Sequence, residues 1–544
     1  MFVKKCWSTN KKTGKRYYNY YIAHSYRPGK GKNPRTKNIV NITPLGEELI
    51  NKIAILLKSN KPGIIPDIEK FFKKSFIYGS IVFILLIIKR MGLIEILKSE
   101  LSQENLIRIL GIILNRILDA RSKLGSVSWL KNTCYSYLYS QDKGLNEDML
   151  YRAMDKLNER LPEILKKIFL KNKKGTRLFL YDITSVFFEG KGPEELSKCG
   201  YSRDEKPKNP QIILALALNE DKLPVYYEIL EGNVSDKKTV IPIINKVKEE
   251  YELIETIFIG DRGMITLENV EYMEREGIDY ILALRHREAR ELLMKRQDMK
   301  GIFDEKVPLE IYSEEGKRYI LCGSEYRKEH DLKNFEKLLK KGRESLESVL
   351  RMVEKGRLKD YEKVVRRAQK KLTKSGAEYF YDFKYHEGKF EIIEKREEIE
   401  KARKLCGYYI LKTSVKNMKE SDVELNYKKL KYVEDAFRQL KGLIKIRPIF
   451  HWKERRVKSH IFLCILSQEI YSQIREVLKN KGWLDKSKEN SVERALDILS
   501  EINLGIFDIE GEELSSVTML TQEQKEIFDI EEKLFTDFNK IKVL

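Results

Sequence analysis

The chain has 544 residues, of which 42% are apolar and 34% charged, and 104 Lys and Arg face 83 Asp and Glu. The length exceeds one ordinary domain, and the net charge of +21 favours a polyanionic partner such as nucleic acid. A solubility feature of a Lys-rich proteome is the alternative explanation of the charge. The longest apolar run, Ile81–Ile88, is too short for a membrane span, which needs about 20 residues, so no membrane partner is expected.

Several other classes lack the sequence features they require. The first residues contain no apolar stretch, so no signal peptide is expected. The six cysteines form no C-x-x-C pair, which argues against a zinc ribbon or a disulfide scaffold and favours a reducing interior. The chain also lacks the glycine-rich G-x-x-x-x-G-K-[ST] motif of nucleotide-driven motors.

The N-terminal third predicts a basic arm followed by helices. Residues 1–45 combine tyrosines with basic Gly- and Pro-containing turns, which predicts a β-hairpin-like arm. Such an arm fits DNA phosphates, and a solvated loop is the alternative. Residues 46–172 carry Leu and Ile at helical spacing and predict a helical domain for DNA binding or dimerisation.

From residue 173 the pattern changes to short apolar strands. Residues 173–285 predict an α/β unit, the first part of a catalytic core, because aromatic and β-branched runs alternate with turns and helices. The five predicted strands lie at 177–188, 211–218, 223–230, 254–264 and 278–285. Three strands in antiparallel succession, followed by helix, strand, helix and strand, predict one mixed five-stranded sheet.

The second half predicts an interruption and then a return of this unit. Residues 286–404 are highly charged and predict an α+β insertion, either a DNA clamp or a solvated spacer. Residues 405–475 resume the core with a strand and two helices, the first at 424–443. Residues 476–544 predict a helical C-terminal tail.

Three acidic residues stand out by their positions. Asp182 interrupts an apolar strand, where an unpaired carboxylate is costly, and Asp261 directly follows another strand. Glu434 lies in the predicted helix 424–443. Each alone has an ordinary explanation, as a turn cap, a turn residue or a helix ion pair. Together they predict a cluster of hard oxygen ligands for Mg²⁺ or Mn²⁺, as used in two-metal phosphoryl transfer.

The helix around Glu434 carries a regular pattern. Tyr427, Glu434 and Lys441 are each seven residues apart, nearly two helical turns, and therefore share one face. Arg438, four residues after Glu434, is predicted close to it on that face. Asp435, the neighbouring acid, is turned by about 100° from Glu434.

The order of the three acids along the chain, and the residues around each of them, resemble those of the DDE transposases of bacterial insertion sequences. The closest group is the insertion-sequence-four superfamily, with its signature Tyr-x2-Arg-x3-Glu-x6-Lys, matched here except that Leu430 replaces Arg. Further matches are Asp-x-Thr at 182–184, Asp-Arg-Gly at 261–263, GYSRD at 200–204 and GNVSD at 232–236.

The resemblance implies a ribonuclease-H-like catalytic core, with Asp182, Asp261 and Glu434 as catalytic ligands of two Mg²⁺ ions and Mn²⁺ as a substitute. It implies that Tyr427 and Lys441 touch the DNA backbone. Proximity in sequence and positive charge add Arg262 and Arg438 as further expected DNA contacts. The expected activity is metal-dependent cleavage and strand transfer of inverted-repeat DNA ends. The expected setting is a homodimer in the prokaryotic cytoplasm, associated with the nucleoid. A non-catalytic or repurposed DNA-binding protein, and a nuclease that cuts without joining, are the alternatives.

Overall fold

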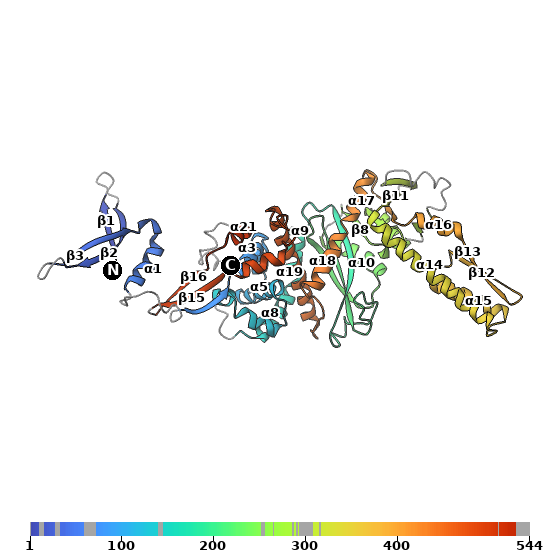
Figure 1. Cartoon of the computed structure of the whole chain (residues 1–544), viewed down its shortest axis with the longest axis horizontal. Helices are drawn as coiled ribbons and strands as arrows, with labels where there is room; N and C mark the ends of the chain where they lie inside the picture. The colour runs from blue at the N-terminus through green and yellow to red at the C-terminus, as the bar shows by residue number, and fades with distance from the viewer. Residues whose placement is uncertain are drawn as a thin grey trace. The chain divides into compact units, whose positions relative to one another are not determined.

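The computed structural model describes residues 2–9, 16–27, 33–58, 72–139, 145–251, 256–264, 266–285, 288–289, 292, 308–314, 317–509 and 511–528. It divides the chain into two compact units (Figure 1). The first consists of Met1–Lys74 and Ile506–Ser515, and the second of Ser75–Gly505 and Ser516–Leu544. Among the described residues, no helix has both the length and the apolar character needed to cross a membrane.

Most of the described N-terminal residues of the first unit form a small antiparallel sheet and a helix that follows it. These elements are β1 (Phe2–Thr9), β2 (Arg16–Tyr26), β3 (Arg35–Asn41) and α1 (Glu47–Lys58). The strands pair in the order β1-β2-β3. Cations lie over aromatic rings, Lys5 at 4.5 Å from the ring centroid of Tyr18 and Arg16 at 5.0 Å from that of Trp7. The Trp7 side chain is 62% exposed, so this sheet presents aromatic and basic groups to solvent.

The predicted helical tail, 476–544, is helical only in part, because some of its described residues form strands. β15 (Asn503–Ile509) and β16 (Glu512–Val517) form a three-stranded sheet with β4 (Phe72–Ile77). In the first unit, Lys73 Nζ lies 2.7 Å from Asp508 Oδ2, and the ring of Phe72 lies against that of Phe507. Gly511, whose φ is 87°, lies between the two strands, and a glycine at such a turn is the local signal that the helical prediction left out.

The helices before residue 173 and those near the C-terminus pack together in the second unit. They are α3 (Gly79–Arg90), α4 (Leu93–Lys98), α5 (Gln103–Leu118), α6 (Lys123–Leu130), α7 (Cys134–Leu138), α8 (Glu147–Glu159), α9 (Leu161–Asn172), α19 (Glu454–Asn480), α20 (Val492–Ser500) and α21 (Gln522–Phe528). The long helix α19 contacts α3, α5 and α8, and its central turns are buried on nearly every side. This packing connects the N-terminal helices to the segment that follows Glu434.

The centre of the second unit is a mixed sheet, larger than predicted. In spatial order its strands are β10 (Leu309–Glu314), β11 (Lys317–Gly323), β14 (Tyr408–Thr413), β9 (Tyr280–Ala283), β8 (Ile257–Gly260), β5 (Leu178–Phe187), β6 (Gln211–Leu218) and β7 (Pro224–Glu231). The five predicted strands are all present and adjacent, β8 and β9 being parallel to β5 and β6 antiparallel to it. The prediction of five strands is wrong, because β14, β11 and β10 extend the sheet by antiparallel pairing.

Two helices after β14 replace the single predicted helix 424–443. They are α17 (Glu420–Lys428) and α18 (Lys431–Gly442), and Leu430 is buried at the joint between them. α18 packs on β5 and β6 through one apolar face, and α17 packs on β9. That face of α18 consists of Val433, Ala436, Phe437 and Leu440. The sheet also contacts α9 and α19 through β7, while α10 (Val240–Tyr251) and α11 (Leu267–Arg275) complete the α/β connections.

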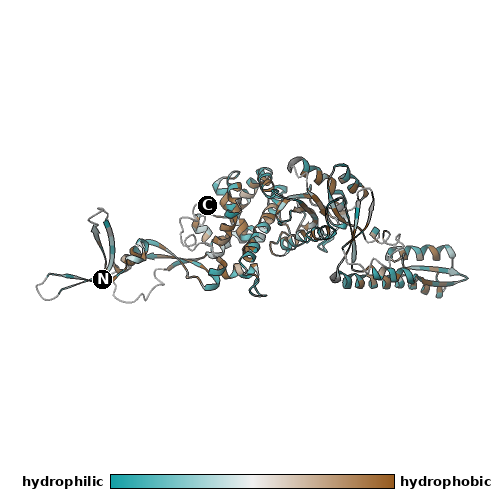
Figure 2. Ribbon diagram, turned by 90° about the horizontal axis from the view of Figure 1, so that it is seen from above, coloured by the Kyte–Doolittle hydropathy of each residue, from teal (hydrophilic) through white to brown (hydrophobic). Residues whose placement is uncertain are grey.

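The predicted insertion contains a helical hairpin with a core of its own. Its elements are α14 (Glu325–Glu354), α15 (Tyr361–Ser375), β12 (Tyr381–His386), β13 (Lys389–Glu394) and α16 (Arg396–Lys404). Buried side chains from these elements form one apolar cluster that includes Leu346, Val364 and Phe380. Figure 2 shows apolar and hydrophilic residues interspersed along these helices, as expected for elements with one buried face.

A buried carboxyl in α19 predicts a pH-dependent stability. Glu469 is 2% exposed, accepts a 3.2 Å hydrogen bond from Asn172, and burial raises its pKa to about 7. Because the pKa of this carboxyl is raised on folding, stability falls as the pH rises from about 4.3, the ordinary pKa of a glutamate, to about 7. We therefore expect the free energy of unfolding of Glu469→Gln, measured relative to wild type, to be about 2–3 kcal/mol larger at pH 8 than at pH 5. Denaturant unfolding at both pH values measures this difference, and an equal gap at the two values would refute it.

Candidate functional site

Asp182 and Asp261 lie on neighbouring strands of the central sheet. Tyr181 of β5 pairs in parallel with Gly260 of β8, so the two aspartates occupy the next matching positions and face the same side. Neighbouring strands are about 4.8 Å apart. Asp182 is partly buried within β5, whereas Asp261 is exposed between the end of β8 and a short 3-10 turn at Arg262–Met264. The sheet register therefore brings together two carboxylates that are distant in sequence.

Glu434 reaches this region from the helix packed on the same strands. The apolar face of α18 lies on β5 and β6, and Glu434, in the first turn of α18, is exposed. The pKa of Asp182 provides evidence of proximity. Burial raises it to about 7, and the negative charges of Asp261 and Glu434 add to that effect. A hydrogen bond of 2.7 Å from the Ile183 amide and the charge of Arg203 act in the opposite direction.

The three acids are thus coupled electrostatically, but they do not form a closed ligand cage. In the part of the chain that the structure describes, no three His, Cys, Asp or Glu side chains are grouped closely enough to hold a metal ion. The donor chemistry nevertheless fits a hard divalent cation, because all three side chains are carboxylates. The pKa of Asp182 is raised mainly by burial and further by the charges of Asp261 and Glu434, and a bound cation would favour the ionised carboxylate against both effects.

Tyr427 lies beside this acidic group, at the end of α17. Its pKa is raised, first by burial and then by the charges of Asp261, Glu434 and Asp182, while Arg327 of α14 lowers it. Its ring packs at 6.0 Å, centroid to centroid, against that of Tyr409, whose face carries the Arg327 guanidinium at 5.1 Å. The break between α17 and α18 means that Tyr427 and Glu434 come from different helices, not from one helix face as predicted.

Lys441 forms an internal ion pair. Its Nζ lies 2.8 Å from Oδ1 of Asp204, and Arg447 contacts the same oxygen. The Asp204 side chain is 2% exposed and that of Lys441 is 16% exposed. Burial lowers the pKa of Lys441, and Asp204 partly compensates. Lys441 therefore fastens the end of α18 to the loop that contains Gly200–Asp204.

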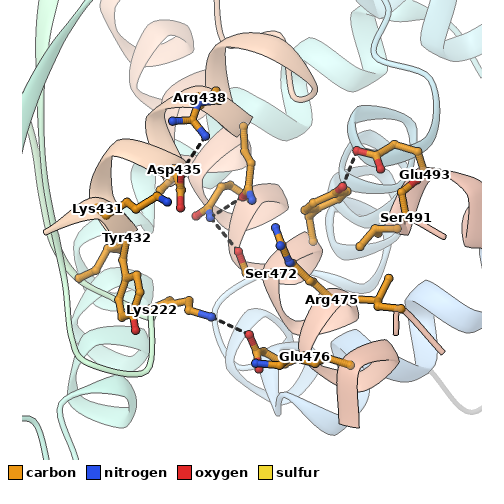
Figure 3. Close-up of a pocket in the computed structure, with 18 of the residues that line it drawn as sticks. Lys222, Lys431, Tyr432, Asp435, Arg438, Ser472, Arg475, Glu476, Ser491 and Glu493 are labelled. Carbon is orange, nitrogen blue, oxygen red and sulfur yellow. Dashed lines mark hydrogen bonds and ion pairs between the residues drawn. The ribbon is translucent and has the colours of Figure 1, made fainter. Parts of the chain in front are cut away.

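Arg438 differs from its predicted position. Its guanidinium bonds Asp435 Oδ1 at 2.8 Å, rather than lying beside Glu434. Both residues line a pocket of about 760 Å³ between α18, α19 and α20, together with Arg475 and the Lys222–Glu476 ion pair (Figure 3). Glu434 does not line this pocket, so Arg438 is directed away from the acidic group.

The structure adds basic residues that the sequence reasoning did not single out. Arg203 acts on the charge of Asp182, Arg327 lies by Tyr427, and Arg447 contacts Asp204. Arg262, predicted as a DNA contact, is partly buried next to Asp261. The GYSRD segment, which contains Arg203, was a sequence signal for one of these residues. The partners of the adjacent Asp204, Lys441 and Arg447, are more than 200 residues away and leave no local pattern.

The fold and the site define an α/β domain in which acidic side chains from two neighbouring strands and an overlying helix approach one another. Residues 173–468 match the transposase DDE domain family. The match covers more than half of the chain, and the chain belongs to this family, whose members are nuclease or transferase enzymes that generally use divalent metals. The matched span includes Asp182, Asp261 and Glu434. A comparison with curated proteins found no match.

Proposed function

We propose that this chain is the transposase of an insertion sequence of the insertion-sequence-four type, which cuts the inverted-repeat ends of its element and joins them to target DNA. The observation that carries the proposal is the shared electrostatic influence of Asp261 and Glu434 on Asp182 within the family's matched span. The strand arrangement β7-β6-β5-β8-β9, three antiparallel strands followed by two parallel ones, supports a ribonuclease-H-like core.

In this proposal Asp182, Asp261 and Glu434 hold two Mg²⁺ ions, with Mn²⁺ as a substitute. When bound there, two such ions would supply activation of a water or a 3′-hydroxyl and stabilisation of the leaving oxygen in an in-line phosphoryl displacement. Asp261 and Glu434 are exposed, so a hydrated cation can reach both carboxylates from solvent. Asp182, fixed within β5, is the rigid member of the set.

The basic residues have different roles in the proposal. Tyr427 and Arg262, next to the acids, contact the backbone of the DNA end near the cleaved phosphate. Lys441 acts on this contact through Asp204, because its charge is paired inside the protein. Arg438 and the pocket of Figure 3 lie outside the cleavage site. Leu430, which replaces the signature arginine, is buried and contributes no DNA contact.

The N-terminal unit and the assembly complete the proposal. The exposed Trp7 and the cations of the β1-β2-β3 sheet suit recognition of the element's ends, with phosphate contacts that weaken as salt increases. A homodimer follows from the need to pair two ends. Light scattering of the chain with one or two DNA ends would test it.

The test uses duplexes made from the inverted repeats that flank the gene. We expect wild-type protein with Mg²⁺ to cleave an intact end and, with a pre-cut end, to join its 3′-hydroxyl to a target plasmid. Chelation by EDTA is expected to abolish both steps, and added Mn²⁺ to restore them. Cleavage without joining would favour the nuclease alternative, and binding without either step would favour a repurposed DNA-binding protein.

A further inference from the structure

A disproportionate share of the chain's positive charge lies in one short segment of the insertion. Residues 355–374 contain nine Lys or Arg and two acidic residues, a net charge of +7 out of +21 for the whole chain. One of the two acids, Asp360, is occupied as the N-cap of α15, where it accepts a 2.9 Å hydrogen bond from the Lys363 amide. The segment contains the turn after α14 and nearly all of α15.

Five of the six cations of α15 occupy one face of the helix; the sixth, Lys371, is less exposed and bonds Ser348 of α14. The five are Lys363, Arg366, Arg367, Lys370 and Lys374, here called the outer face, and all five are exposed. Their spacing places them within an arc of about 100°. The opposite face carries Val364, Ala368 and Leu372, which are buried in the apolar core of the insertion. The helix is therefore held in place by one side and presents charge on the other.

The outer face differs from other basic surfaces of the insertion in lacking acidic partners. Among the described residues, none of the five cations forms an ion pair. By contrast, Arg343 of α14 pairs with Glu347 and Glu394, and Arg403 of α16 pairs with Glu336 and Glu400. Surface charges that serve only solubility are normally of mixed sign. Five like charges on one helix face repel one another, a cost that an anionic partner would remove.

The length of the outer face suits the backbone of a double helix. From Lys363 to Lys374 the helix rises about 16 Å. Duplex DNA presents about one negative charge per 1.7 Å of its axis, so roughly ten phosphate charges accompany this length. Long, flexible Lys and Arg side chains can reach them without a particular base sequence.

We infer that the outer face of α15 binds the phosphate backbone of duplex DNA, independently of base sequence, and so makes the insertion a DNA-holding element. The inference rests on the proposed function for the choice of DNA as the polyanion. The positive surface of the insertion would then hold DNA at a distance from the cleavage site. Of the two roles considered for the insertion, a DNA clamp is therefore favoured over a solvated spacer.

The experiment measures binding of full-length protein to a random-sequence 30-base-pair duplex in EDTA, by fluorescence anisotropy from 50 to 300 mM NaCl. The test variant carries Lys363→Gln, Arg366→Gln, Arg367→Gln and Lys370→Gln. The control carries Arg343→Gln, Lys395→Gln, Lys401→Gln and Arg403→Gln, which removes the same formal charge from cations that are already paired. We expect the slope of log affinity against log salt to fall by about 3–4 in the test variant and by less than about 1 in the control.

Equal slopes in wild type and test variant would overturn the inference, as would equal losses in test and control variants. A charge-preserving variant, Arg366→Lys with Arg367→Lys, is expected to keep the wild-type slope, and its failure to do so would also count against a phosphate contact. A parallel titration with duplex RNA separates the partners, since a loss confined to RNA would contradict the assignment to DNA. Cleavage of inverted-repeat ends is assayed separately, so an inactive wild type with the predicted slopes would refute the proposed function and leave this inference standing.

Discussion

Glu434→Gln is expected to lower the rate of DNA-end cleavage by roughly 10³-fold, since loss of a metal ligand removes several kcal/mol of transition-state stabilisation. The substitution keeps the size of the side chain and removes its charge. Glu434 is exposed and none of its neighbours in the apolar face of α18 is altered, so folding and DNA binding should persist. Single-turnover cleavage of a labelled end in Mg²⁺ measures the rate.

The neighbouring acid supplies a matched control. Asp435 lies one residue further along α18, pairs with Arg438 and lines the pocket of Figure 3. Asp435→Asn removes the same charge from the same turn, and we expect it to cleave within about threefold of wild type, the scale of a surface substitution of less than 1 kcal/mol. Equal losses in the two variants would show that net charge, rather than the position of Glu434, controls the rate.

The second large effect concerns stability. Asp204→Ala is expected to destabilise the protein by about 3–5 kcal/mol, because it leaves Lys441 and Arg447 partly buried without their counter-charge. Denaturant unfolding at neutral pH gives the free energy. Asp435→Ala, which breaks an ion pair whose Arg438 side chain is 73% exposed, is expected to cost less than about 1 kcal/mol. A cost below about 1 kcal/mol for Asp204→Ala would show that this buried group is not needed to fasten α18.

Local sequence patterns predicted the strands that carry the site. An apolar run interrupted by Asp182 became β5, and Asp261 follows β8 as its position after an apolar run indicated. Both predictions depended on residues that are near one another in sequence. The order of three antiparallel strands followed by two parallel ones also followed from local patterns and short connections.

Features that depend on distant residues were not predictable in the same way. β11 pairs with β14 across nearly the whole insertion, and no local pattern marks such a partner. The Lys441–Asp204 pair joins residues 237 positions apart. The break before Lys431 contains no Gly or Pro, so the helical spacing continues through it and a single helix was the natural prediction. These differences changed the expected role of Lys441 from a DNA contact to an internal one.

The central claim, that Asp182, Asp261 and Glu434 together hold divalent metal, is tested most directly by counting bound Mn²⁺. Electron paramagnetic resonance of free Mn²⁺ gives the number of ions bound per chain in complex with a cut DNA end. We predict about two for wild type and for Asp435→Asn, and fewer than one for Asp182→Asn. Wild-type binding by Asp182→Asn, with its fold intact, would contradict the account.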